Sequence, residues 1–73
     1  MLKKRSVRIA GHDTSVTLEE PFWVALKKIA SEEELSINKL IASIDKERKG
    51  NLSSALRLYI LQSLQDKLAQ QIT

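Results

Sequence analysis

The chain has 73 residues, no cysteine and a single histidine, and its net charge at neutral pH is +3. A chain of this length forms one domain at most and buries only about 60% of the surface that it exposes when unfolded, so its own core gives marginal stability. Disulfides are excluded, and one histidine without cysteine does not supply the ligands of a structural zinc site. The remaining support for so small a core is an oligomeric interface, so we expect an obligate homodimer.

The composition, 42% apolar and 29% charged, indicates a folded domain rather than a disordered chain. No apolar run approaches the roughly 18 residues that span a bilayer, and the first residues lead into a polar strand rather than a signal-peptide core. We therefore expect a cytoplasmic protein without a membrane partner. The sequence has no Gly-rich phosphate loop and no spacing typical of a catalytic triad, so we expect no enzyme, no cofactor and no metal. His12 is interpreted as a turn residue.

Positive charge is concentrated at the amino terminus, where four cations precede the first acidic residue, Asp13: Lys3, Lys4, Arg5 and Arg8. Residues 1–12 are interpreted as a basic arm or an extra strand. A dimer would carry two such arms, which favours an anionic polymer as the partner.

Two short segments alternate between apolar and polar residues, as half-buried strands do. The first is 6–10, with Val7 and Ile9 on one face, and the second is 14–19, with Val16 and Leu18 on one face. The two segments can fold back as a local hairpin, or the first can be an extended arm while the second pairs with a symmetry mate. We favour the second arrangement, because the connection lacks the Asn-Gly or Asp-Gly that most favours a tight hairpin.

Three helices are predicted after the strands. The first begins at Glu20 or Pro21 and runs to about Glu33, with proline in the first turn. The second begins after Ser36, a good amino-terminal cap, and ends at Gly50. The third is capped by Asn51 or Ser53, and its apolar residues cover more than one face, which suggests burial against a partner chain. The residues predicted to form the core or the dimer interface are Val16, Leu18, Phe22, Trp23, Leu26, Ile29, Leu40, Ile41 and Ile44.

The order of these elements, with 16–18 before the first helix and 35–41 leading into the second, resembles the ribbon-helix-helix family of DNA-binding proteins, which includes the Arc and MetJ repressors. The resemblance covers about Asp13 to Glu47. It implies a mainly α fold with a short β-ribbon, in which residues 13–50 form the ribbon-helix-helix core and 51–73 an additional C-terminal helix. It also implies a small dimeric transcriptional regulator that inserts an antiparallel ribbon, one strand from each subunit, into the major groove of double-stranded DNA.

The resemblance places Ser15 and Thr17 on the base-facing side of the ribbon. These short side chains discriminate bases weakly, and Asp13 and Glu19 on the same face are expected to oppose phosphates. The first turn of the second helix is expected to present backbone N–H groups to a phosphate. The predicted phosphate contacts are Lys3, Lys4, Arg5, Arg8, Ser36, Ile37, Asn38 and Lys39.

Because Ser15 and Thr17 discriminate bases weakly, a second interpretation of the function stays open. The same dimeric fold can serve as a protein-interaction module, similar to an antitoxin or an adaptor, which binds a second polypeptide through Leu58, Leu61 and Leu68. A membrane-surface role for the third helix is disfavoured, because its polar face carries few cations.

Overall fold

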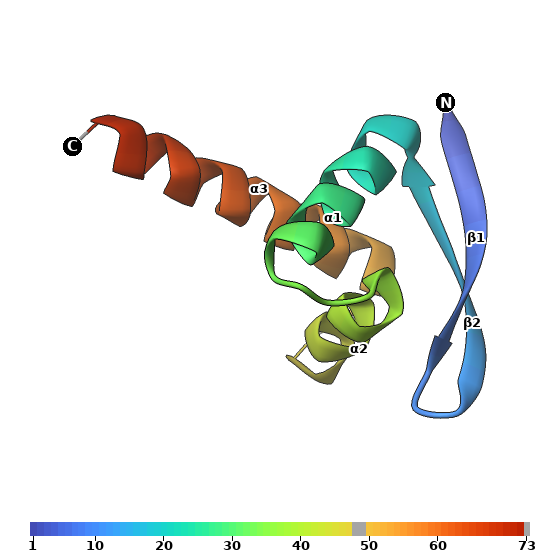
Figure 1. Ribbon diagram of the computed structural model, residues 1–73. Helices are drawn as coiled ribbons and strands as arrows, with labels where there is room; N and C mark the ends of the chain where they lie inside the picture. The colour runs from blue at the N-terminus through green and yellow to red at the C-terminus, as the bar shows by residue number, and fades with distance from the viewer. Residues whose placement is uncertain (48–49, 73) are drawn as a thin grey trace.

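The computed structural model describes residues 1–47 and 50–72. The described residues form two strands followed by three helices: β1 (Leu2–Ile9), β2 (His12–Glu19), α1 (Glu20–Glu32), α2 (Ile37–Glu47) and α3 (Leu52–Ile72). Figure 1 shows the hairpin standing to one side of the helices, with β2 leading directly into α1. This order of elements confirms the predicted ribbon-helix-helix fold with an additional C-terminal helix.

The strands β1 and β2 form an antiparallel hairpin within one chain, so the disfavoured arrangement of the two is the one that the structure adopts. Only Ala10 and Gly11 connect the strands, and both have a positive φ, 51° and 83°. Positive φ at both central residues is the geometry of a tight hairpin turn whose twist matches that of the strands. The expectation failed because Ala10 takes a position that asparagine or glycine usually occupies.

Helix α1 follows β2 without a connection, and Pro21 lies in its first turn, where a missing N–H costs no hydrogen bond. Its buried residues are Trp23, Leu26, Ile29 and Ala30. At the other end, Leu35 N–H donates to Ala30 C=O at 2.9 Å and Glu34 N–H to Ser31 C=O at 3.1 Å. This pair of bonds closes the helix in a Schellman motif, which requires a left-handed residue at Glu34, with a φ of 57°.

Helices α2 and α3 begin with side-chain caps. Ser36 Oγ accepts a hydrogen bond from Lys39 N–H at 3.2 Å, and Asn51 Oδ1 accepts one from Ser54 N–H at 3.2 Å. Each cap satisfies one of the N–H groups that a helix start leaves without an intrahelical partner. Asn51, rather than Ser53, is thus the cap of α3.

One apolar cluster joins the hairpin to all three helices. Its buried members are Val7, Ile9, Val16, Leu18, Trp23, Leu26, Ile29, Ala30, Leu40, Ile41, Leu52, Leu56 and Ile60, and Phe22, Ile44 and Tyr59 pack partly buried against it. Only the first half of α3 enters this cluster. The second half extends beyond the other elements, as Figure 1 shows, so part of α3 lies outside the core of its own chain.

Candidate nucleic-acid interface

The hairpin has one apolar face and one polar face. Val7, Ile9, Val16 and Leu18 are buried against the helices. Because side chains alternate along a strand, the neighbouring residues point away from the helices. We call this polar side the outward sheet face, and it consists of Lys4, Ser6 and Arg8 from β1 and Asp13, Ser15 and Thr17 from β2.

The strand register places the two predicted base-facing residues opposite residues of β1. Thr17 is the Cα partner of Lys4, and Ser15 is the partner of Ser6. Lys4 and Ser6 are exposed, as is Ser15, whereas Thr17 is half-buried. The outward sheet face therefore combines three hydroxyl groups with an adjacent lysine, a richer set of donors than Ser15 and Thr17 alone. The contribution of Ser6 was missed from the sequence, because only the register of the hairpin reveals it.

Arg8 and Asp13 close the turn end of the outward sheet face. They form an ion pair with 3.3 Å between Arg8 Nη1 and Asp13 Oδ1, and Arg8 Nη2 also donates to Gly11 C=O at 3.3 Å. Both side chains are well exposed, and a pair of this kind contributes little stability, so it can exchange for another partner. Asp13 is thus matched by a cation, which lessens the repulsion of phosphate expected from it.

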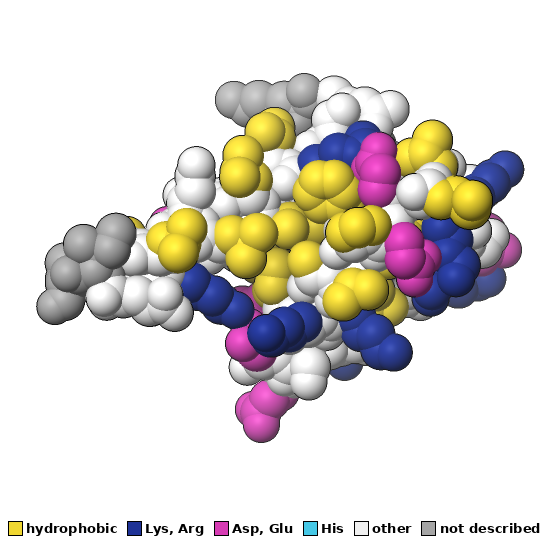
Figure 2. Space-filling view, turned by 90° about the horizontal axis from the view of Figure 1, so that it is seen from above, with side chains coloured by type: hydrophobic (Ala, Val, Ile, Leu, Met, Phe, Trp, Pro, Cys, Tyr) yellow, Lys and Arg dark blue, Asp and Glu magenta, His cyan; other side chains and the backbone are white. Residues whose placement is uncertain are grey.

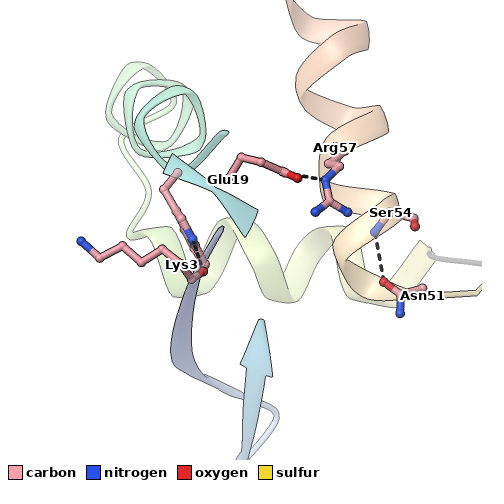
Figure 3. A network of polar contacts seen from close by, with 6 residues as sticks. Lys3, Glu19, Asn51, Ser54 and Arg57 are labelled. Carbon is pink, nitrogen blue, oxygen red and sulfur yellow. Dashed lines mark hydrogen bonds and ion pairs between the residues drawn. The ribbon is translucent and has the colours of Figure 1, made fainter. Parts of the chain in front are cut away.

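The second carboxylate expected on this face, Glu19, binds the third helix instead. Glu19 Oε1 accepts a hydrogen bond from Arg57 Nε at 2.9 Å, and the Arg57 guanidinium lies 5.8 Å from the centre of the Phe22 ring. Figure 3 shows the Glu19 and Arg57 side chains directed toward each other from β2 and α3. The hydrogen bond and charge of Arg57 lower the pKa of the Glu19 carboxyl. This pairing with Arg57, which local sequence patterns did not indicate, lessens the repulsion of phosphate expected from Glu19.

The four cations of β1 divide between its two sides. Lys4 and Arg8 lie on the outward sheet face, and among the residues that the structure describes Lys4 has no ion pair. Lys3 and Arg5 lie toward α1, where Lys3 Nζ is 3.7 Å from Glu20 Oε2 and the Arg5 guanidinium lies 5.3 Å from the centre of the Trp23 ring. Trp23 Nε1–H also donates to Lys3 C=O at 2.9 Å. Residues 2–9 are consequently held as a strand against the helices.

The start of α2 supplies the other predicted anion contact. Ser36 caps Lys39 N–H, and Leu40 N–H donates to Ser36 C=O at 3.0 Å. The N–H groups of Ile37 and Asn38 belong to the first turn, where a helix offers no backbone acceptor, and the helix dipole makes this end attractive to an anion. Asn38 and Lys39 are exposed and Ile37 is half-buried.

Other classes of site find no support in the described part of the chain. Within residues 1–47 and 50–72, no group of three or more potential ligands could hold a metal ion. In the same residues, no helix is long and apolar enough to cross a membrane. His12, predicted as a turn residue, is the exposed first residue of β2.

Comparison with known proteins agrees with this architecture. Residues 2–64 match the family described as "Ribbon-helix-helix domain". A solved structure of an uncharacterized protein from Bordetella pertussis Tohama I is similar, with 32% sequence identity and a TM-score of 0.74. The similarity covers 92% of this chain and 60% of that protein, so this chain spans about three fifths of its length. No curated protein matches. With most of its length matched by the family, the chain belongs to the ribbon-helix-helix domain family.

Proposed function

We propose that this protein is a homodimeric regulator that binds double-stranded DNA, with the outward sheet face in the major groove. The observation that carries the proposal is the placement of Ser15 and Thr17 beside Lys4 and Ser6 on one face of the hairpin, where Ser15, Lys4 and Ser6 are exposed and Thr17 is half-buried. Membership of a family of DNA-binding folds supports it.

The dimer is proposed to form along the second edge of β2. In a hairpin with a two-residue turn, the pair beside the turn exchanges backbone hydrogen bonds, and every second pair does the same. Thr14 and Val16 therefore direct their backbone groups to β1, whereas Asp13, Ser15 and Thr17 direct theirs to the opposite edge. Among the described residues that edge has no strand neighbour. An edge of this kind pairs readily with a second copy.

Antiparallel pairing of two β2 strands would produce a sheet of four strands, with β2 strands in the centre and β1 strands outside. Strands lie about 4.8 Å apart, so the two β1 strands would be roughly 14 Å apart. The major groove is about 12 Å wide and admits a two-stranded ribbon. The central strands then carry Ser15 and Thr17 to the base edges, and the outer strands carry Lys4 and Arg8 to the phosphates on each side.

The chemistry of these side chains fits two separate roles, which are contact with base edges in the centre of the sheet and contact with phosphates at its sides. A hydroxyl can donate to or accept from a base edge, and the Thr17 methyl can contact a thymine methyl. Lys4, Arg8, Lys39 and the first turn of α2 bind phosphates without regard to sequence. Lys3 and Arg5, on the other side of β1, add to the positive potential that attracts the duplex.

The experiment that tests this function is a binding titration with a pool of random duplexes at two salt concentrations, followed by sequencing of the bound fraction. In the dimer, Lys4→Ala removes two phosphate contacts and should lower the salt slope by about two for every sequence. Thr17→Ala should change the selected sequences with little effect on the slope.

Lys28→Ala is the matched control, since Lys28 lies on α1 and not on the sheet. This variant should bind like the unchanged protein. Failure to bind any duplex at low salt, or an equal loss in Lys28→Ala and Lys4→Ala, would refute the proposal.

A further inference from the structure

One side of α3, from Leu58 to Leu68, exposes a row of leucines that the packing of its own chain leaves open. Leu58, Leu61, Leu64 and Leu68 are 66%, 50%, 48% and 58% exposed. Figure 2 shows apolar side chains gathered in a band from the α3 end of the molecule to the middle of this face. Soluble monomers rarely expose a contiguous apolar patch of this kind, and such patches mark interaction sites. We call these four residues the leucine stripe.

The stripe is separate from the face by which α3 packs on its own chain. Leu52, Leu56 and Ile60 form the buried side of the helix. Polar contacts on the packed side join α3 to α1, where Lys67 Nζ lies 2.6 Å from Glu32 Oε1 and Tyr59 Oη donates to Glu33 Oε2 at 3.1 Å. These contacts fix the rotation of α3, so the stripe faces outward because the other side of the helix is occupied.

The stripe borders an open groove of about 530 Å³ between α2 and α3. Ile44, Ala55 and Tyr59 line the groove together with Leu58, and Glu47 is the one charged residue among the lining residues that the structure describes. A projecting leucine row therefore lies next to an apolar depression. When two identical molecules meet about a two-fold axis, each can place its projection in the depression of the other, as an isologous interface requires.

The charges around the stripe also suit a second copy. Arg57 is paired with Glu19, Lys67 with Glu32, and Asp66 accepts a hydrogen bond from Gln62 at 3.0 Å. The other polar neighbours, Ser54 and Gln65, are uncharged. Two copies of the leucine stripe would thus meet largely through uncharged side chains, with the acidic Glu47 of the groove at the edge. The scarcity of unpaired cations argues against nucleic acid or an anionic membrane as the occupant.

We infer that the leucine stripe and the groove beside it bind the same surface of a second copy of this chain, through antiparallel packing of two α3 helices. The spacing from Leu61 to Leu64 to Leu68, three residues and then four, is that of the seam between paired helices. This interface is distinct from the β2 edge. With both interfaces occupied, dimers joined through β2 would be linked further into tetramers or longer assemblies.

The first test measures molecular mass by sedimentation over a range of protein concentrations. Leu61→Gln with Leu64→Gln should weaken one step of association at least tenfold. Val24→Gln is the matched control, because Val24 is 60% exposed but lies on α1. Ser15→Pro, which blocks the β2 edge, should leave the α3 step intact. An unchanged mass in the double variant overturns the inference, whatever happens at the β2 edge.

A second test uses the absence of cysteine in the chain. In Leu61→Cys, the reactivity of the single thiol toward a soluble disulfide reagent should fall as the protein concentration rises through the association step. In Val24→Cys it should stay constant. Equal reactivity of the Leu61→Cys thiol in the dilute and associated protein would show that a second copy does not cover the stripe.

Discussion

At the scale of single residues, the contact between Glu19 and Arg57 links the end of β2 to α3. The Arg57 hydrogen bond keeps the pKa of the Glu19 carboxyl below its ordinary value of 4.5. A group whose pKa is lowered by folding stabilises the folded state above its unfolded pKa, and this stabilisation is lost as the pH falls through the lowered value. The contact therefore contributes at neutral pH and fails in acid.

From this we predict the acid sensitivity of a variant. Glu19→Gln should lower the free energy of unfolding at about pH 7, and it should reduce the further loss of stability between about pH 5 and pH 3, because the variant has no carboxylate there to protonate. Urea unfolding followed by circular dichroism at each pH measures both quantities. Glu34→Gln, with no ion pair in the described part of the chain, is the control. Equal acid sensitivity in Glu19→Gln and the unchanged protein would contradict the prediction.

Single positions of the candidate interface were only partly predictable. Alternation of apolar and polar residues was sufficient to place Ser15 and Thr17 on one face of β2 and Val16 and Leu18 on the other face. It was not sufficient to place Lys4 beside Thr17, because the register of a hairpin depends on the turn, and a shift of one residue would reverse every side chain.

At the scale of elements, the helices were more predictable than the strands. Their bounds follow from local features, which are the proline in the first turn of α1, the Ser36 and Asn51 caps and the apolar spacing. The hairpin depends on two residues with positive φ, one of them alanine. Gly11 marks a turn, but because alanine adopts that conformation rarely, the sequence carried no local mark of a tight two-residue hairpin.

The end of α1 provides a prediction at this scale. Glu34 adopts a φ of 57°, which costs a residue with a Cβ about 1 kcal/mol and glycine almost nothing. Glu34→Gly should therefore raise the free energy of unfolding by about 0.5–1 kcal/mol, which corresponds to a rise of several degrees in the melting temperature.

Glu33→Gly is the matched control, measured by thermal unfolding under the same conditions. Glu33 has a φ of −92° and its side chain accepts the hydrogen bond of Tyr59. This variant should be destabilised. A loss of stability in Glu34→Gly as large as that in Glu33→Gly would show that the left-handed conformation carries no strain.

At the scale of the whole molecule, the proposed pairing of β2 edges couples stability to concentration. A dimer that forms from folded chains gains stability by mass action, so the melting temperature should rise with protein concentration. Ser15→Pro should reduce this dependence, because the Ser15 N–H is directed to the outer edge of β2 and proline cannot donate a bond there. The Ser15 N–H takes no part in the backbone hydrogen bonds between β1 and β2, so the hairpin should still form in this variant.

Differential scanning calorimetry across a hundredfold range of concentration, with Ser15→Ala as the control, checks this prediction. Ser15→Ala keeps the backbone donor and should retain the full dependence. If Ser15→Pro melts with the same dependence as Ser15→Ala, the β2 edge is not the site of pairing.

The closed hairpin also bears on how the protein is made. A strand that finds its partner two residues away along the same chain can pair within microseconds, without a collision between molecules. The amino-terminal strands can therefore complete most of their mutual backbone bonds while the rest of the polypeptide is still being synthesised. The proposed assembly would then join chains whose hairpins are already ordered, and only the outer edges of β1 and β2 would remain open to another strand.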